Sequence, residues 1–276
     1  MKKIGVIGTG NMGTILIEAW LEAKILNPAD LIITNRTLSK ALVLKEKHPG
    51  IKVAESAAEI VEQADFIFLC VKPLQINSLL QGIKQHIKRD QLVISITSPL
   101  SVSQLESAVN APCARFIPSI TNRVGSGVSL LSFSESCSKE KVSALFDLAS
   151  AISAPVIIEN DITRVASDIV SCGPAFFSYL AQAFIDAACQ TTKIDKETAT
   201  TLTENMLVGL GELLGKGVYT LPTLQEKVCV KGGITGEGIK VLEAETGEMF
   251  HHLFQATHEK FAEDLHEVEK QFGHPY

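Results

Sequence analysis

Apolar residues follow two different patterns along the chain, and the change between them comes near residue 160. Before that point, short apolar runs alternate with segments in which apolar positions recur at helical spacing. A short apolar run bounded by turn residues is typical of a strand covered on both faces, and regular alternation with helices is typical of a parallel sheet. The expected strands are 4–7, 31–34, 51–53, 66–71, 92–96, 113–118, 127–131 and 156–159.

From residue 161 onward, the apolar positions follow helical periodicity only. The segment 175–188 is apolar on nearly all sides, so it should be buried in a helical bundle or between the subunits of a homodimer or larger homo-oligomer. The pattern predicts the α/β fold class. A Rossmann-type, doubly wound and mostly parallel sheet occupies residues 1–160, and an all-helical dimerisation domain occupies residues 161–276. The expected helices of this second domain are 162–190, 195–216, 234–245 and 248–271.

The first strand runs directly into a glycine-rich turn and a helix. Gly8, Gly10 and Gly13 have G-x-G-x-x-G spacing, and helical periodicity follows over 14–23. In this context the glycines permit a tight turn, close approach of a pyrophosphate and close packing of helix on strand, while free N–H groups at the helix start meet the phosphates. The alternative is a strand–helix turn without a ligand. The predicted phosphate-binding residues are Ile7, Gly8, Thr9, Gly10, Asn11, Met12 and Gly13.

The end of the second strand indicates which dinucleotide is bound. An NAD-binding unit usually carries an acidic residue here to bind the ribose 2′-hydroxyl, but this chain has Asn35, Arg36 and Thr37. Arg36 can pair with a 2′-phosphate, and its two neighbours offer hydrogen bonds. We therefore predict NADP(H) as the cofactor, with NAD(H) as the alternative. Thr37 could also act only as the N-cap of the helix 38–48.

Val71, Lys72 and Pro73 follow the fourth expected strand. The carboxyl ends of strands are where open α/β sheets bind ligands, and proline can open the next helix. We predict that these three residues lie near the cofactor. The alternative for Lys72 is an ordinary surface lysine.

A second pair of glycines precedes a helix in the C-terminal half. Gly232 and Gly233 leave several N–H donors exposed at a positive helix end, and Thr235 adds a hydroxyl after Ile234. This arrangement suits a small carboxylate. The alternative is a simple turn between two helices.

Composition and spacing exclude several classes of function. The 276 residues carry a formal net charge of −6 without a basic block, so nucleic-acid binding is not indicated. No run approaches the roughly 20 apolar residues that a membrane helix needs. The six cysteines lack CxxC spacing, as expected of reduced thiols in a cytoplasmic protein. His251, His252, His258 and His266 match no ligand motif, so no metal is expected, and Cys172 has no evident partner base.

Taken together, these motifs resemble the pyrroline-5-carboxylate reductase family, and within it the late-competence-operon branch of reductase-like proteins. The likeness spans nearly the whole chain. Members of the family reduce the C5=N imine of 1-pyrroline-5-carboxylate to L-proline with NAD(P)H. The segments that carry the resemblance are 7–13, 35–36, 71–73, 94–96, 115–118, 173–176 and 232–235.

The resemblance implies a site and a mode of assembly. The substrate, a small-molecule imine carboxylate, would lie between the nicotinamide and the Gly-Gly-x-Thr turn of a helical domain that dimerises, sometimes into larger rings. Hydride transfer to a protonated imine needs positioning and desolvation rather than a metal or a nucleophile. Thr235, the implied catalytic residue, would hydrogen-bond near the ring nitrogen. The implied substrate-binding residues are Ser171, Lys231, Gly232, Gly233, Ile234 and Thr235.

The chain departs from the family pattern mainly around the substrate, whereas the phosphate-binding turn keeps the pattern. Segment 170–172 is Val-Ser-Cys where the family has Ser-Gly-Ser, and 230–231 is Val-Lys where it has Ser-Pro. Residues 97–99 are Thr-Ser-Pro in place of Ala-Ala-Gly. The leading hypothesis is an NADP-dependent pyrroline-5-carboxylate reductase of proline biosynthesis. The alternatives are a reductase of another imine or keto acid, and a non-catalytic NADP-binding paralogue.

Overall fold

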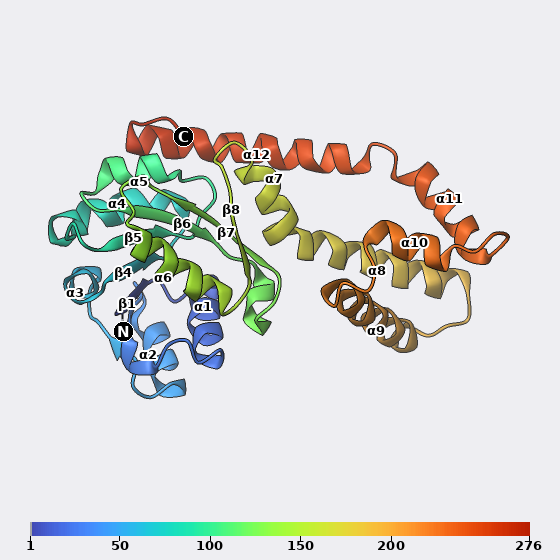
Figure 1. Cartoon of the computed structure of the whole chain (residues 1–276), viewed down its shortest axis with the longest axis horizontal. Helices are drawn as coiled ribbons and strands as arrows, with labels where there is room; N and C mark the ends of the chain where they lie inside the picture. The colour runs from blue at the N-terminus through green and yellow to red at the C-terminus, as the bar shows by residue number, and fades with distance from the viewer. Residues whose placement is uncertain (1) are drawn as a thin grey trace. The chain divides into compact units, whose positions relative to one another are not determined.

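Eight strands form one sheet in the computed structural model, which describes residues 2–276 (Figure 1). Their order is β3-β2-β1-β4-β5-β6-β7-β8, and every neighbouring pair is parallel except β6 with β7. The predicted doubly wound, mostly parallel sheet is therefore confirmed. The strands are β1 (Ile4–Ile7), β2 (Leu31–Thr34), β3 (Lys52–Val53), β4 (Phe66–Leu69), β5 (Leu92–Ser95), β6 (Cys113–Ile117), β7 (Val128–Phe133) and β8 (Ala154–Ile157).

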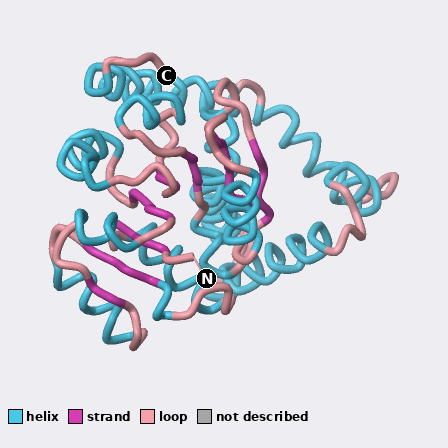
Figure 2. Tube along the Cα trace, turned by 60° about the vertical axis from the view of Figure 1, so that its left-hand side comes forward, coloured by secondary structure: helices cyan, strands magenta, loops and turns pink. Residues whose placement is uncertain are grey.

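Helices cover both faces of this sheet (Figure 2). Successive side chains of β4 show why both faces must be covered: Phe66 and Phe68 enter one hydrophobic cluster, while Ile67 and Leu69 enter the other. Because side chains alternate along a strand, a strand that is apolar throughout needs an apolar partner on each side. The helices and 3₁₀ turns of this part are α1 (Asn11–Glu22), η1 (Pro28–Asp30), α2 (Leu38–Lys47), α3 (Ala57–Gln63), α4 (Pro73–Ile83), η2 (Lys84–His86), α5 (Val102–Ala108), η3 (Ile120–Val124) and α6 (Lys139–Ser150).

Trp20 on α1 is the centre of the first cluster. Its indole N–H donates to the Leu148 carbonyl of α6 at 3.0 Å. Its ring lies 5.0 Å from the ring of Phe68 and 6.4 Å from that of Phe116. The ring contacts join α1 to β4 and β6, and the hydrogen bond joins α1 to α6, so the packing on this face depends in part on three aromatic side chains.

The end of the chain contributes to the second cluster. Val268 on α12 (Met249–Phe272) is fully buried in it, and Phe272 packs against it. Residues 256–276 accordingly belong to the same compact unit as residues 2–174, whereas residues 175–255 form a second unit. The domain boundary at residue 160 stays a prediction. The two compact units divide the chain after residue 174 and after residue 255.

Residues 163–191 form one helical segment with a wider turn inside it. It consists of α7 (Thr163–Ser167), the π-helical turn η4 (Asp168–Cys172) and α8 (Gly173–Thr191). On α8 the side chains of Phe177, Tyr179 and Phe184 are 64%, 75% and 65% exposed within one chain. Of the two environments expected for segment 175–188, a position between subunits accounts better for this exposure.

The second unit also contains α9 (Lys196–Gly215), α10 (Leu221–Val228) and α11 (Ile234–Thr246). Helix α10 was not expected, because Pro222 reads as a break between helices. The structure places this proline in the first turn, after a Thr220 cap that pairs with Thr223, where the missing N–H costs nothing. Within residues 2–276, no helix combines the length and apolarity needed to cross a bilayer.

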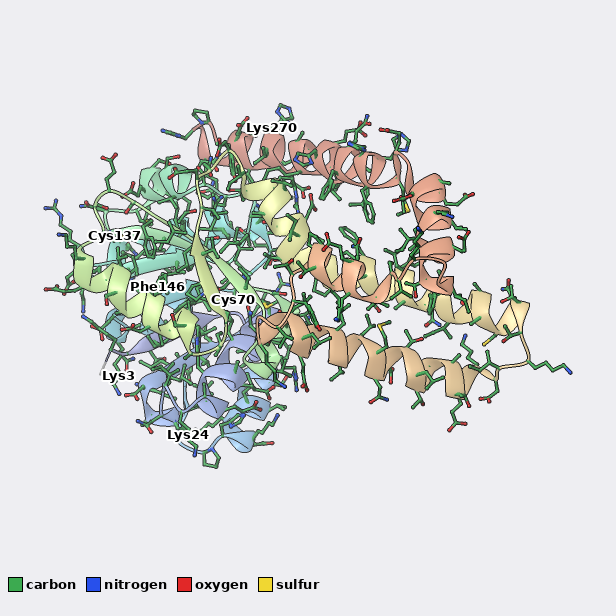
Figure 3. The ribbon with its side chains drawn as sticks, turned by 45° about the vertical axis from the view of Figure 1, so that its right-hand side comes forward. Lys3, Lys24, Cys70, Cys137, Phe146 and Lys270 are labelled. Carbon is green, nitrogen blue, oxygen red and sulfur yellow. The ribbon has the colours of Figure 1, made fainter. Side chains whose placement is uncertain are left out.

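We expect Phe116→Ala to lower the free energy of unfolding of the sheet unit by about 3–5 kcal/mol, because it leaves a cavity among fully buried rings. Trp20, the single tryptophan of the chain, lies against the altered site and reports unfolding by its fluorescence. Phe146→Ala is the matched control, since Phe146 is 36% exposed on α6 (Figure 3), and it should cost less than about 1 kcal/mol. Equal losses for the two variants would contradict this account of the core.

Candidate functional site

The carboxyl ends of three strands meet at one point of the sheet edge. The Gly8 N–H donates to the Thr34 carbonyl at the end of β2, and the Cys70 N–H after β4 donates to the Ile7 carbonyl, both at 2.8 Å. Strand order reverses here, since β1 lies between β2 and β4. Segments 7–13, 35–37 and 71–73 all follow these strands, so the structure brings the predicted cofactor-binding residues to the switch point of the sheet.

The three glycines of the turn have different surroundings. Gly8 has a φ of +109°, and a Cβ atom there would lie 2.3 Å from the Cys70 carbonyl oxygen. A Cβ atom on Gly13 would lie 2.1 Å from the Gly8 carbonyl oxygen, whereas one on Gly10 would meet nothing within 4 Å. The first and third glycines are therefore required by the turn itself. The space beside Gly10 is open, as a site needs if a ligand is to approach the backbone closely.

Helix α1 begins at this turn without a side-chain cap. Gly10 is the N-cap residue, and no acidic residue lies in the first turn. The first helical hydrogen bond runs from the Thr14 N–H to the Gly10 carbonyl at 3.0 Å. The N–H groups of residues 11–13 consequently point out of the positive helix end. The Thr9 hydroxyl, buried beside them, has no hydrogen-bond partner. Unmet donors and an orphaned hydroxyl fit a bound pyrophosphate.

Asn35 fastens the second loop to the glycine turn. Its side-chain oxygen accepts from the Thr9 N–H at 3.1 Å, and its side-chain nitrogen donates to the Thr37 carbonyl at 3.0 Å. Its amide is thus engaged by the backbone on both sides. Asn35 therefore holds the loop in place.

Arg36 and Thr37 are exposed at the same loop. No acidic residue of the described chain pairs with the Arg36 guanidinium, which leaves its fork of donors available to an anion. Thr37 is the N-cap residue of α2, but its side chain makes no capping hydrogen bond. Its hydroxyl is therefore not used in the way that the capping alternative requires.

The third loop has the form expected of a helix start. Pro73 is the first residue of α4 and Lys72, which is exposed, is its N-cap residue. A Cβ atom on Gly8 would lie 3.2 Å from a methyl carbon of Val71, so this loop borders the glycine turn. Burial raises the pKa of the neighbouring Cys70 thiol to about 12. Cys70 (Figure 3) therefore lines the candidate site as an unreactive thiol and is not a nucleophile.

The Gly232 turn of the second unit is a tight reversal before α11. The Gly233 N–H donates to the Val230 carbonyl at 2.9 Å, and Gly232 has a φ of +75°. A turn with glycine in this third position accepts proline in the second, where Lys231 stands. Gly233 is the N-cap residue of α11, so no side chain caps the start of this helix. Ile234 is 93% exposed, and the Thr235 hydroxyl is exposed beside it.

Ser171 takes part in a reciprocal pair of hydrogen bonds. Its hydroxyl donates to the Pro118 carbonyl at 2.9 Å, and the Ser119 hydroxyl donates to the Val170 carbonyl at 2.8 Å. The two bonds hold the π-helical turn against the end of β6, so the proton of Ser171 is engaged within the chain. Burial raises the pKa of the adjacent Cys172 thiol, which argues against a reactive thiolate there.

Two of the most deeply buried charged side chains were not assigned a role from the sequence. Arg115 in β6 is 1% exposed, and Asp168 in η4 is equally buried. Asp168 accepts hydrogen bonds from Arg164 and from the Thr257 hydroxyl, both at 2.8 Å. A charged residue inside an otherwise apolar strand is the signal that could have identified Arg115, because such a residue needs specific partners.

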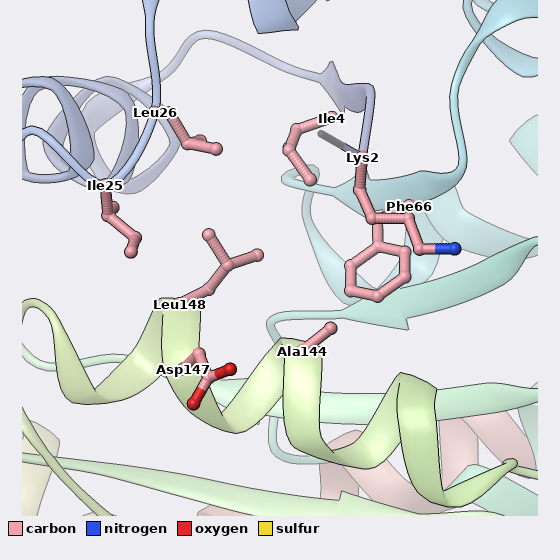
Figure 4. A pocket seen from close by; sticks show the side chains of 8 residues that line it. All are labelled: Lys2, Ile4, Ile25, Leu26, Phe66, Ala144, Asp147 and Leu148. Atoms are coloured by element: carbon pink, nitrogen blue, oxygen red, sulfur yellow. The ribbon is translucent and has the colours of Figure 1, made fainter.

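An apolar pocket of about 200 Å³ lies at the opposite edge of the sheet (Figure 4). It lies beside the amino ends of β1 and β4, where Ile4 and Phe66 line it together with Leu148 of α6. It carries few polar groups and is remote in the sheet from the glycine turn. We therefore place the candidate cofactor site at the carboxyl edge.

Each half of the chain contains a segment that matches a known protein family. Residues 3–99 match the family described as NADP oxidoreductase, coenzyme F420-dependent, and residues 160–264 match pyrroline-5-carboxylate reductase dimerisation. The chain is 54% identical to ComE operon protein 4 of Bacillus subtilis (strain 168), over 98% of this chain and 99% of that protein. It is 28% identical to pyrroline-5-carboxylate reductase 3 of the same organism, over 98% and 100% of the two chains.

Among solved structures, the fold is similar to that of Plasmodium falciparum pyrroline carboxylate reductase with NADP bound. The TM-score is 0.80 at 22% identity, and the match covers 98% of each chain. At this level of identity, the likeness supports the fold alone. The long match at 54% identity and the dimerisation segment together assign the family. The chain belongs to the pyrroline-5-carboxylate reductase family, in the branch that contains ComE operon protein 4.

Proposed function

We propose that this chain is an NADP(H)-dependent reductase of a cyclic imine carboxylate, with 1-pyrroline-5-carboxylate as substrate and L-proline as product. The observation that carries the cofactor choice is Arg36, an exposed cation without an acidic partner in the described chain, at the position where a ribose-binding carboxylate would favour NAD. The family membership supports the reaction.

Each of the three loops at the carboxyl edge of the sheet has a role in this proposal. The N–H groups at the start of α1 and the hydroxyl of Thr9 hold the pyrophosphate, and Gly10 leaves room for it. Arg36 and Thr37 hold the 2′-phosphate, while Asn35 keeps their loop against the turn. Val71, Lys72 and Pro73 border the same edge. When bound, the nicotinamide supplies the hydride.

On the substrate side, the proposal uses the residues that the family resemblance implies. The N–H groups of Ile234 and Thr235 at the start of α11 bind the carboxylate, and the charge of Lys231 attracts it. The Gly233 N–H is not available, because it donates to the Val230 carbonyl. The Thr235 hydroxyl orients the ring nitrogen. Ser171 acts by holding the π-helical turn. The exposed apolar side chains of α8 are covered in a homo-oligomer formed through the dimerisation segment.

A second candidate function is NADP binding without turnover. Two observations favour it: the chain is 54% identical to ComE operon protein 4 but 28% identical to a reductase, and its departures from the family pattern lie around the substrate at 170–172 and 230–231. A reductase of another imine or keto acid would be compatible with the same changes.

The glycine turn can be tested with two alanine variants. Gly10→Ala should lower the thermal midpoint only slightly, because its Cβ atom meets no protein atom within 4 Å and the poorer N-cap costs at most about 1 kcal/mol. It should weaken NADPH binding at least tenfold, about 1.4 kcal/mol. Gly13→Ala should instead destabilise the fold itself by about 1–3 kcal/mol, because its Cβ atom meets backbone. Calorimetry with and without NADPH measures both. Unchanged NADPH affinity in Gly10→Ala would show that phosphates do not lie against this turn.

Arg36→Ala should weaken NADPH binding by roughly 10- to 100-fold, the effect of losing a charge-assisted contact of about 1.5–3 kcal/mol. NADH lacks the 2′-phosphate, so its affinity should be nearly unchanged and serves as the internal control. Titration followed by nucleotide fluorescence measures both constants. Equal losses for the two nucleotides would remove the basis for NADP preference.

The reaction is tested by NADPH oxidation with 1-pyrroline-5-carboxylate and with a panel of other cyclic imines and keto acids. We expect turnover with 1-pyrroline-5-carboxylate, and we expect Thr235→Val to lower kcat at least tenfold, about 1.4 kcal/mol. Thr246→Val is the matched control, since the Thr246 hydroxyl only bonds the Leu242 carbonyl at the end of the same helix. Turnover confined to another substrate would favour the other-substrate reductase, and NADPH binding without turnover would favour the non-catalytic protein.

A further inference from the structure

The tail of the chain, residues 271–276, comprises the last residues of α12 and those that follow it, and it is held against helices that cover one face of the sheet. The Gln104 side chain on α5 donates to the His274 carbonyl at 2.9 Å, and the Asn77 side chain on α4 donates to the Gln271 carbonyl. The Tyr276 N–H donates to a Glu269 carboxylate oxygen at 3.2 Å. These contacts give the tail a defined path over α4 and α5.

Tyr276 ends this path at a loop of the sheet. Its hydroxyl accepts from the Arg115 guanidinium at 2.7 Å and donates to the Ser98 carbonyl at 3.0 Å. Its ring packs edge-on against the ring of Phe261, with 5.8 Å between the two ring centroids. The hydroxyl proton and an acceptor lone pair are both engaged, so the phenol links the strand β6 to the loop after β5.

Arg115 makes this link stronger than a surface hydrogen bond. Its guanidinium donates to the Thr163 hydroxyl at 2.6 Å, to the Ser132 hydroxyl at 3.3 Å and to the Ser98 carbonyl at 3.1 Å. No acidic side chain in residues 2–276 forms an ion pair with it. A buried cation surrounded by neutral oxygens depends on each of them, and its charge polarises the Tyr276 hydroxyl toward the Ser98 carbonyl.

The loop that Tyr276 holds lies at the carboxyl edge of the sheet. It follows β5, which pairs with β4, and a hydroxyl–hydroxyl contact of 3.0 Å between Ser95 and Thr97 shapes its start. In a doubly wound sheet the half that begins with β1 takes one mononucleotide of the cofactor, and the half that begins with β4 takes the other. With the 2′-phosphate assigned to Arg36 after β2, the loop at 97–99 borders the nicotinamide half.

We infer that Tyr276 is a positioning residue for the nicotinamide half of the cofactor site, acting through Arg115 and the Ser98 carbonyl on the loop 97–99. The inference rests on the proposed NADP site. The tail thus belongs to the reductase machinery although it lies far along the chain from the dinucleotide fingerprint.

Tyr276→Phe in the full chain is the test, because it removes the hydroxyl and keeps the ring against Phe261. NADPH binding should weaken by about 3- to 10-fold, the effect of one lost hydrogen bond. The affinity for 2′-phospho-ADP-ribose, which lacks the nicotinamide, should be unchanged. Without any nucleotide, amide hydrogen exchange at Thr97 and Ser98 should become faster. Tyr219→Phe, at a half-buried tyrosine in the turn between α9 and α10, is the matched control and should change none of these.

Several outcomes would overturn the inference. Equal weakening of NADPH and 2′-phospho-ADP-ribose would show that the tail acts on the fold as a whole, and unchanged NADPH affinity with unchanged exchange would show that it does not position the loop. If the unaltered chain binds neither nucleotide, the proposed function fails by itself. The exchange measurement then still decides whether Tyr276 holds the loop: unchanged rates at Thr97 and Ser98 would overturn that role.

Discussion

Burial of both faces of the sheet is the constraint on which the rest of the structure depends. Each parallel crossover brings a helix to one face, but β6 and β7 are antiparallel neighbours joined through the short turn η3. That connection supplies no long helix, and on β8 the side chains of Val156 and Ile157 are 45% and 56% exposed within one chain. Over β4 and β5, the end of the chain returns to the sheet unit, and Val268 lies in the second hydrophobic cluster with residues of α4 and α5. The position of Tyr276 beside Arg115 follows from this return.

The residues at the glycine turn fall into two groups: those that the fold requires, and those left free for the ligand proposed above. Gly8 and Gly13 are needed because carbonyl groups occupy the space of a side chain, whereas Gly10 faces open space. Asn35 and Arg36 divide in the same way, since one side chain is engaged by the backbone and the other is exposed. Residues that are adjacent in sequence and belong to one motif can therefore have unrelated physical reasons for their identity.

Local patterns predicted most of the fold, because a strand buried on both faces and an amphipathic helix each leave a periodic signal. All the expected strands are present, although β8 begins at Ala154 and includes Pro155, which an edge strand tolerates. Features that depend on distant contacts were not predicted. The residues near Asp168 carry no pattern that predicts a π-helical turn. The hydrogen-bond partners of Arg115 could not be predicted either, because they are distant in sequence, at residues 98, 132, 163 and 276. For the site, the three loops at the sheet edge could be predicted from strand ends, but the engagement of the Ser171 hydroxyl by Pro118 could not.

The exposed apolar side chains of α8 have a consequence for the abundance of the protein. In residues 175–255 of a single chain, the buried side chains are Ile185, Ala199 and Thr203. So small an interior contributes little hydrophobic free energy, and most of the stability of these helices must come from contacts with another copy. The folded fraction of the helical half then follows mass action. A cell that makes few copies would hold much of this half in unfolded or protease-sensitive form, so expression level itself would act as a threshold for activity.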